Sequence, residues 1–276
     1  MTPSRIWMLL LIGCGSLWLA VGGDPSLGKS ETFSWQQAPP PATAEAQTPT
    51  NPSQSQALSP QDRADIFMAR KLYADAVDYY LRALRESKYS DPVLWNKLGI
   101  AYQQQMNFRQ ARKSYNQAIK HNREFSEAWN NIGTTFYMQN KFGKSVNYYL
   151  RALKIAPDSA SFHLNLGTSY YHMKKYTEAV EAYRKALSLD PNILSERSLT
   201  ATVVATQGVG PEFYFYMAKV FASLGRPEEA VRYLRHALED GFADKKRINQ
   251  DPDFQKIGQN PAFIELMNNL PIPIKD

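Results

Sequence analysis

Residues 126–159 read SEAWNNIGTTFYMQNKFGKSVNYYLRALKIAPDS, and the same pattern of residue types recurs before and after this stretch. Equivalent residues lie 34 positions apart in three successive windows. A fixed period of this length indicates a chain built from repeated structural units. The recurring residues are Trp95, Trp129 and His163; Leu98-Gly99, Ile132-Gly133 and Leu166-Gly167; Tyr115, Tyr149 and Tyr183; and Ala118, Ala152 and Ala186.

Each window has the spacing of two helices joined by a tight turn. In the middle window, Trp129, Ile132 and Gly133 recur at helical spacing and therefore share one face. Tyr149 and Ala152 form the facing stripe of the second helix. We interpret these residues as core, with Gly133 small because the second helix crosses close to it.

This period and pattern resemble the tetratricopeptide repeat family. The resemblance implies an all-α solenoid of helix-turn-helix repeats, wound as a right-handed superhelix with a concave side. We place the solenoid at residues 59–242. Its repeats lie at about 57–91, 92–125, 126–159, 160–193 and 211–242, and the first of them is degenerate or capping.

The period breaks between residues 194 and 210, before the last repeat. Leu199–Thr206 is rich in β-branched residues, and Gln207–Gly210 is a turn signal. We expect a loop or a short β-hairpin there. Two interpretations stay open, namely a disordered insertion and a loop that contacts a partner.

Residues 243–276 form a tail after the last repeat, similar to one found in many bacterial proteins of this family. Asp253 and Asn260 are placed to begin short helices. We expect this tail to cover the exposed end of the solenoid, which a repeat protein needs for solubility. The covering residues would be Phe254, Ile257, Phe263, Leu266 and Met267.

The first 23 residues are typical of a signal peptide or an N-terminal membrane anchor. Arg5 precedes an apolar run from Ile6 to Val21. Three routes stay open: lipidation of Cys14 in Leu11-Ile12-Gly13-Cys14, which resembles a bacterial lipobox; cleavage after Gly22 or Gly23; or retention as an anchor. Each predicts an exported protein of the periplasm or cell envelope.

Residues 24–58 are rich in Pro, Gln, Ser and Thr, and we expect a disordered linker between the envelope and the solenoid. The chain carries a formal net charge of +6. The basic residues either form a solvated surface or favour binding to acidic partners or anionic lipid head groups. Export argues against a nucleic acid partner.

Catalytic constellations are not visible in the sequence. The four histidines are scattered, without the i, i+4 spacing of a helical zinc site. Phosphate-binding and dinucleotide-binding loops are lacking, and a single cysteine cannot form a disulfide within the chain. We therefore expect neither enzymatic activity, nor a metal, nor a cofactor.

The family resemblance implies that the first helix of each repeat lines a peptide-binding groove. We reject a clamp for a terminal carboxylate, because the positions of that clamp hold Asn96, Ile100, Asn131, Ser161 and Asn165, and its cations are missing. Asn131 and Asn165 match instead an asparagine ladder, whose amides suit the backbone of an extended peptide. The alternative is that these asparagines only hydrate the surface. The candidate groove residues are Asn96, Asn130, Asn131, Tyr137, Asn165, Thr168, Tyr171, Tyr216 and Lys219.

These observations predict a non-enzymatic adaptor or scaffold of the cell envelope that holds a partner protein or an extended peptide. A structural protein that associates with itself, through its end helices or through residues 194–210, is the alternative. Membrane attachment through the N-terminal segment is compatible with both.

Overall fold

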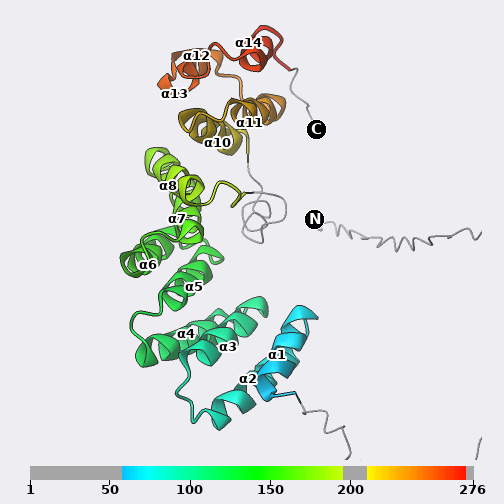
Figure 1. Cartoon of the computed structure of the whole chain (residues 1–276), viewed down its shortest axis with the longest axis vertical. Coiled ribbons are helices and arrows are strands. Elements are labelled where there is room, and N and C mark those ends of the chain that lie inside the picture. The colour runs from blue at the N-terminus through cyan, green and yellow to red at the C-terminus, as the bar shows by residue number, and fades with distance from the viewer. Residues whose placement is uncertain (1–57, 195–209, 272–276) are drawn as a thin grey trace, which may run out of the picture. The chain divides into compact units, whose positions relative to one another are not determined.

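The computed structural model describes residues 58–194 and 210–271. Consecutive helical pairs follow one another along these residues (Figure 1). Within each pair the two helices are joined by a short turn and pack against each other. The pairs are α1 (Pro60–Ala69) with α2 (Tyr73–Glu86), α3 (Pro92–Gln104) with α4 (Phe108–His121), α5 (Ser126–Tyr137) with α6 (Phe142–Ile155), α7 (Ala160–His172) with α8 (Tyr176–Leu189), and α10 (Pro211–Ser223) with α11 (Pro227–Glu239).

The second helix of each pair packs against the first helix of the next pair, so neighbouring pairs share their interfaces. First helices also contact each other, α3 with α5 and α5 with α7. The described residues contain helices and no strand. The predicted all-α solenoid of helix-turn-helix repeats is therefore confirmed. The predictions for the N-terminal segment, the linker and most of residues 194–210 lie outside the described residues.

Helices within a pair approach each other closely where a glycine faces a tyrosine ring. A Cβ atom added at Gly133 would lie 2.7 Å from Cδ1 of Tyr149. The same contact recurs at Gly99, opposite Tyr115, and at Gly167, opposite Tyr183. Because this distance is far below van der Waals contact, the ring occupies the space that a side chain would need. The close crossing predicted at Gly133 is thus present in three successive pairs.

The turn between the two helices of each pair contains one residue with a positive φ angle. In the first four pairs that residue is not glycine, and in the last pair it is Gly225, with φ of +68°. A left-handed conformation costs an L-residue about 1 kcal/mol, so the turn geometry is imposed by the packing of the two helices. The four other residues are Lys71, Met106, Asn140 and Lys174.

The tail (residues 243–271 of the described chain) forms three short helices, α12 (Lys245–Gln250), α13 (Pro252–Gln255) and α14 (Pro261–Asn268). α13 contacts α10, and α14 contacts α11, so the tail covers both helices of the last pair. Asn260 caps α14 as predicted, whereas the cap of α13 is Asp251 and not Asp253. The tail residues buried in the core of the last two pairs include Phe254, Ile257, Phe263 and Leu266.

We predict that Gly133→Ala destabilises the protein by about 1–3 kcal/mol, because its methyl group would overlap the Tyr149 ring. The lower end of the range is expected, since Ala64 occupies the equivalent place opposite Tyr80 in the first pair. Urea unfolding followed by circular dichroism measures the change.

The last pair offers a natural control. It has Ala218 at the position of Gly133 and Leu234 at the position of Tyr149. Tyr149→Leu should therefore cost less in the Gly133→Ala background than in the wild-type chain. Equal costs in the two backgrounds would show that the glycine and the tyrosine do not compete for the same space.

Candidate functional site

The first helices α3, α5 and α7 present one continuous surface, which we call the inner-helix face. Their adjacency follows from the contacts of α3 with α5 and of α5 with α7. Residues one period apart are therefore brought side by side on this face. The asparagines that the sequence singled out lie at such positions.

Four asparagines on the inner-helix face form a continuous hydrogen-bonded chain. Nδ2 of Asn165 donates to Oδ1 of Asn130 at 3.0 Å, and Nδ2 of Asn130 donates to Oδ1 of Asn131 at 3.2 Å. Nδ2 of Asn131 donates to Oδ1 of Asn96 at 2.9 Å. Each amide can do this because it carries both donors and an acceptor. We refer to Asn96, Asn131, Asn130 and Asn165 as the asparagine chain.

The asparagine chain has a buried and an accessible side. Asn96 and Asn130 are each only 8% exposed, whereas Asn131 and Asn165 are partly exposed. Each of these last two amides retains a second N–H, and the carbonyl oxygen retains one lone pair in Asn131 and both in Asn165. The accessible amides are thus held in fixed orientations by the buried ones, with hydrogen-bonding capacity left for a ligand.

Thr168 and Tyr137 belong to the packing of the pairs, which corrects the expectation that they line an open groove. Thr168 is 6% exposed, and its hydroxyl accepts from Tyr183 and donates to the carbonyl of Leu164. Tyr137 is 2% exposed and shares a hydrogen bond of 3.0 Å with Nε2 of His172. Both side chains are therefore out of reach of a ligand.

Tyr171 lies at the end of α7, in contact with the following helices. Its ring meets Phe213 edge-on and lies 5.8 Å from the ring of Tyr176. Burial, reinforced by the negative charge of Glu212, raises the pKa of Tyr171 to about 12. The side chain is only partly buried, so Tyr171 remains a candidate contact beside the asparagine chain.

Tyr216 and Lys219 are covered by the tail, which also departs from the open groove that we expected. Tyr216 is 6% exposed and accepts a hydrogen bond from Nη2 of Arg247. Nζ of Lys219 lies 2.6 Å from the carboxylate of Asp251. The groove positions of the last pair are therefore part of a polar contact between α10 and the tail.

Arg247 and Asp251 are site residues that the sequence reasoning missed. One signal pointed to them: the last pair has Lys219 where the two preceding pairs have Thr134 and Thr168. A lysine at a half-buried position requires an acidic partner. Since no other pair is followed by a tail, the repeat pattern could not identify that partner as Asp251.

Among residues 58–194 and 210–271, no group of three or more His, Cys, Asp or Glu side chains is arranged to hold a metal ion. None of the helices in the same residues combines the length and the apolar character that a membrane span requires. Cys14 lies outside the described residues.

Comparison with protein families agrees with this architecture. Tetratricopeptide repeat models match residues 96–160, 160–193 and 211–239. The chain carries tetratricopeptide repeats. No curated protein matches its sequence.

Several solved structures are similar to this chain at low sequence identity. A fragment of MamA from Desulfovibrio magneticus RS-1 is 16% identical, with a TM-score of 0.47 over 67% of this chain and 94% of that chain. TTC0263, a thermophilic TPR protein of Thermus thermophilus, is 19% identical, with a TM-score of 0.46 over 69% and 94%. YrrB, described as a TPR protein with an unusual peptide-binding site, is 14% identical, with a TM-score of 0.43 over 69% and 89%.

We predict that His172 makes the stability of the protein depend on pH. Its ring stacks on Phe142 at 4.7 Å and bonds to Tyr137, and burial lowers the pKa of His172 below 6.5. As the pH falls, His172 therefore becomes protonated at a higher pH in the unfolded chain than in the folded chain. The contribution of His172 is fully present above pH 6.5 and is lost as the pH falls toward the lowered pKa.

Urea unfolding at about pH 7.5 and at about pH 5, on either side of the ordinary histidine pKa, measures this effect. His172→Gln, which retains a partner for Tyr137, should reduce the loss of stability between the two pH values. An identical loss in both proteins would show that other groups cause it.

Proposed function

We propose that this chain is a non-enzymatic adaptor of the cell envelope that holds an extended segment of a partner protein on the inner-helix face. The observation that carries the proposal is the asparagine chain, with two accessible amides held by two buried ones. Tetratricopeptide repeats generally mediate protein–protein interaction, and the repeat matches span most of α3 and the whole of α5 and α7.

Backbone recognition follows from the chemistry of the accessible amides. The peptide bond offers one donor and one acceptor, and the side-chain amides of Asn131 and Asn165 offer the same pair in reverse. Because both amides are already oriented by Asn96 and Asn130, little rotamer entropy is lost when a peptide binds. We therefore infer a partner segment that is extended and recognised mainly through its backbone.

Side-chain contacts would be provided at the edge of the asparagine chain. Tyr171 offers a partly exposed aromatic ring on the α8 side. On the other side, Nζ of Lys97 lies 2.6 Å from the carboxylate of Asp65, which also accepts from Tyr80. That ion pair connects α1 of the first helical pair with α3 of the second. It places a positive and a negative side chain next to Asn96.

The location in the envelope is supported by the N-terminal sequence. Arg5 followed by the apolar run from Ile6 to Val21 has the form of an export signal. Whether Cys14 is lipidated, the segment is cleaved, or it serves as an anchor, the repeats would reach the periplasm or the outer surface of the membrane. Incorporation of labelled palmitate into the wild-type chain but not into Cys14→Ser would separate the first route from the others.

A second candidate function is self-association through the N-terminal end of the solenoid. Leu58, Ile66 and Leu72 are exposed around α1, where no tail covers the first pair within the described residues. Two copies could bury these side chains against each other. Light scattering over a range of concentrations tests this alternative, and a monomer at all concentrations removes it.

We predict that Asn131→Ala/Asn165→Ala weakens binding of a selected peptide at least several-fold. Two net hydrogen bonds of about 1 kcal/mol each are removed, and about 1.4 kcal/mol corresponds to ten-fold in affinity. Peptides are first selected from an array with the full-length chain in mild detergent, and affinities are then measured by fluorescence anisotropy.

The matched control is Asn116→Ala/Asn147→Ala, which removes two exposed amides from the second helices α4 and α6. This control should bind like the wild-type chain. Methylation of the peptide's backbone nitrogens should weaken binding more than alanine substitution of its side chains. Equal affinities of the two double variants would remove the asparagine chain from the binding surface.

A further inference from the structure

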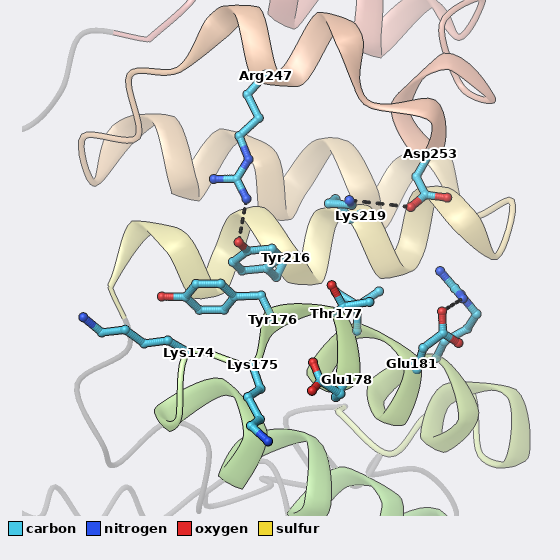
Figure 2. A pocket seen from close by; sticks show the side chains of 12 residues that line it. Lys174, Lys175, Tyr176, Thr177, Glu178, Glu181, Tyr216, Lys219, Arg247 and Asp253 are labelled. Carbon is cyan, nitrogen blue, oxygen red and sulfur yellow. Dashed lines mark hydrogen bonds and ion pairs between the residues drawn. The ribbon is translucent and has the colours of Figure 1, made fainter.

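A pocket of about 630 Å³ lies where the last two pairs meet the tail (Figure 2). Three segments far apart in the sequence form its walls: the start of α8, the first helix α10 and the tail from α12 to α13. None of the four asparagines of the asparagine chain lines this pocket. The residues that matter below are Tyr176, Glu178, Arg184, Tyr216, Lys219 and Arg247.

Arg247 is an exposed residue that lies at the top of this pocket in Figure 2. Its guanidinium lies 4.5 Å from the ring centre of Phe215 and 5.2 Å from that of Tyr216. Nη2 donates to the hydroxyl of Tyr216, and the backbone N–H of Arg247 donates to the side chain of Asp244. Stacking and hydrogen bonding thus fix an arginine whose side chain is otherwise costly to immobilise.

The guanidinium of Arg247 has no carboxylate partner within the described part of the chain. Other cations at the pocket do have one: Arg184 pairs with Glu181 at 2.6 Å, and Lys219 pairs with Asp251. A guanidinium has five N–H groups, and only one of those of Arg247 donates to a described protein atom. Its remaining donors are therefore available to an anion.

The charge around the pocket favours an anion over a cation. Lys174 and Lys175 are exposed and, like Arg247, form an ion pair with no acid among the described residues. These three cations stand against two acids without an ion pair, Glu178 in the lining and Glu212 near Tyr176. Figure 2 shows both lysines pointing away from Arg247, so they contribute to the field and not to direct contacts. The surplus of positive charge attracts an anion, and Arg247 is placed to bind it.

An aromatic surface lies beside Arg247. The rings of Tyr176 and Tyr216 stack with centres 4.4 Å apart and an angle of 17° (Figure 2). Tyr216 is buried, whereas Tyr176 is only partly buried and faces the pocket. A ligand bound to Arg247 would therefore contact a flat apolar ring, which suits a peptide better than an inorganic ion.

We propose that this pocket binds a carboxylate of a peptide, with Arg247 as a two-pronged donor and Tyr176 as the contact for the neighbouring side chain. The planar fork of arginine matches a carboxylate in geometry as well as charge. The tail would then have a second role besides covering the last pair, because it contributes Arg247, the residue that binds the carboxylate. This site uses α8, α10 and the tail, so it does not depend on the function proposed for the asparagine chain.

The test uses the full-length chain and three short peptides. Acetyl-Tyr-Glu-amide carries a side-chain carboxylate, acetyl-Gly-Tyr carries a terminal carboxylate, and acetyl-Tyr-Gln-amide carries neither. The Nε–H signal of Arg247 in a ¹⁵N-correlated NMR spectrum, assigned by its loss in Arg247→Gln, reports binding directly. We expect saturable shifts with one or both acidic peptides and at least ten-fold weaker binding of the neutral one.

Variants separate the anchor from general charge. Arg247→Gln should weaken binding of the acidic peptide at least ten-fold, and Arg247→Lys should weaken it less, because a point charge replaces the fork. Arg235→Gln, which removes an exposed arginine from α11, should have no effect. Circular dichroism and urea unfolding verify that the variants keep the fold. If Arg247→Gln does not fold, the comparison of Arg247→Lys with the wild-type chain decides the test.

The peptide that binds identifies the source of the carboxylate, a side chain or a chain terminus. Equal shifts with the neutral peptide, or equal affinity of Arg247→Gln, would overturn the proposal. Saturation by inorganic phosphate without binding of either acidic peptide would also overturn it, since the pocket would then be a simple anion site.

Discussion

The architecture depends on one repeated contact, in which a tyrosine of the second helix fills the space left by a glycine of the first. The hydroxyl of the same tyrosine then reaches a polar group on that first helix. Tyr149 donates to Thr134 at 3.3 Å, and Tyr183 donates to Thr168 at 3.4 Å. Burial raises the pKa of both tyrosines, so they remain neutral donors. One residue therefore sets the distance between the helices and their register.

The inner-helix face is a consequence of that register. Because successive pairs are built alike, residues one period apart come together, and amides separated by 35 residues are within hydrogen-bond distance. The asparagine chain thus ties three pairs together while keeping two amides accessible. The last pair breaks the pattern, with Ala218, Leu234 and Lys219 at the repeated positions, and there the tail supplies the missing partners.

The periodic part of this structure could be predicted from the sequence, whereas the polar contacts between repeats and between the last pair and the tail could not. Helices, pairs and the close crossing at Gly133 follow from residues that recur every 34 positions. The bonding of the asparagines to one another depends on the offset between pairs, which a single repeat does not encode. The burial of Tyr137 and the covering of Tyr216 depend on His172 and on Arg247, which have no equivalents in other repeats.

Binding on the inner-helix face is tested by following the side-chain amide signals of the asparagines while a selected peptide is added. In a ¹⁵N-correlated NMR spectrum, we expect the Nδ2 signals of Asn131 and Asn165 to shift with the same saturation curve. The signals of Asn116 and Asn147, on the second helices, should stay in place. Shifts confined to the second helices or to the tail would contradict binding on the inner-helix face.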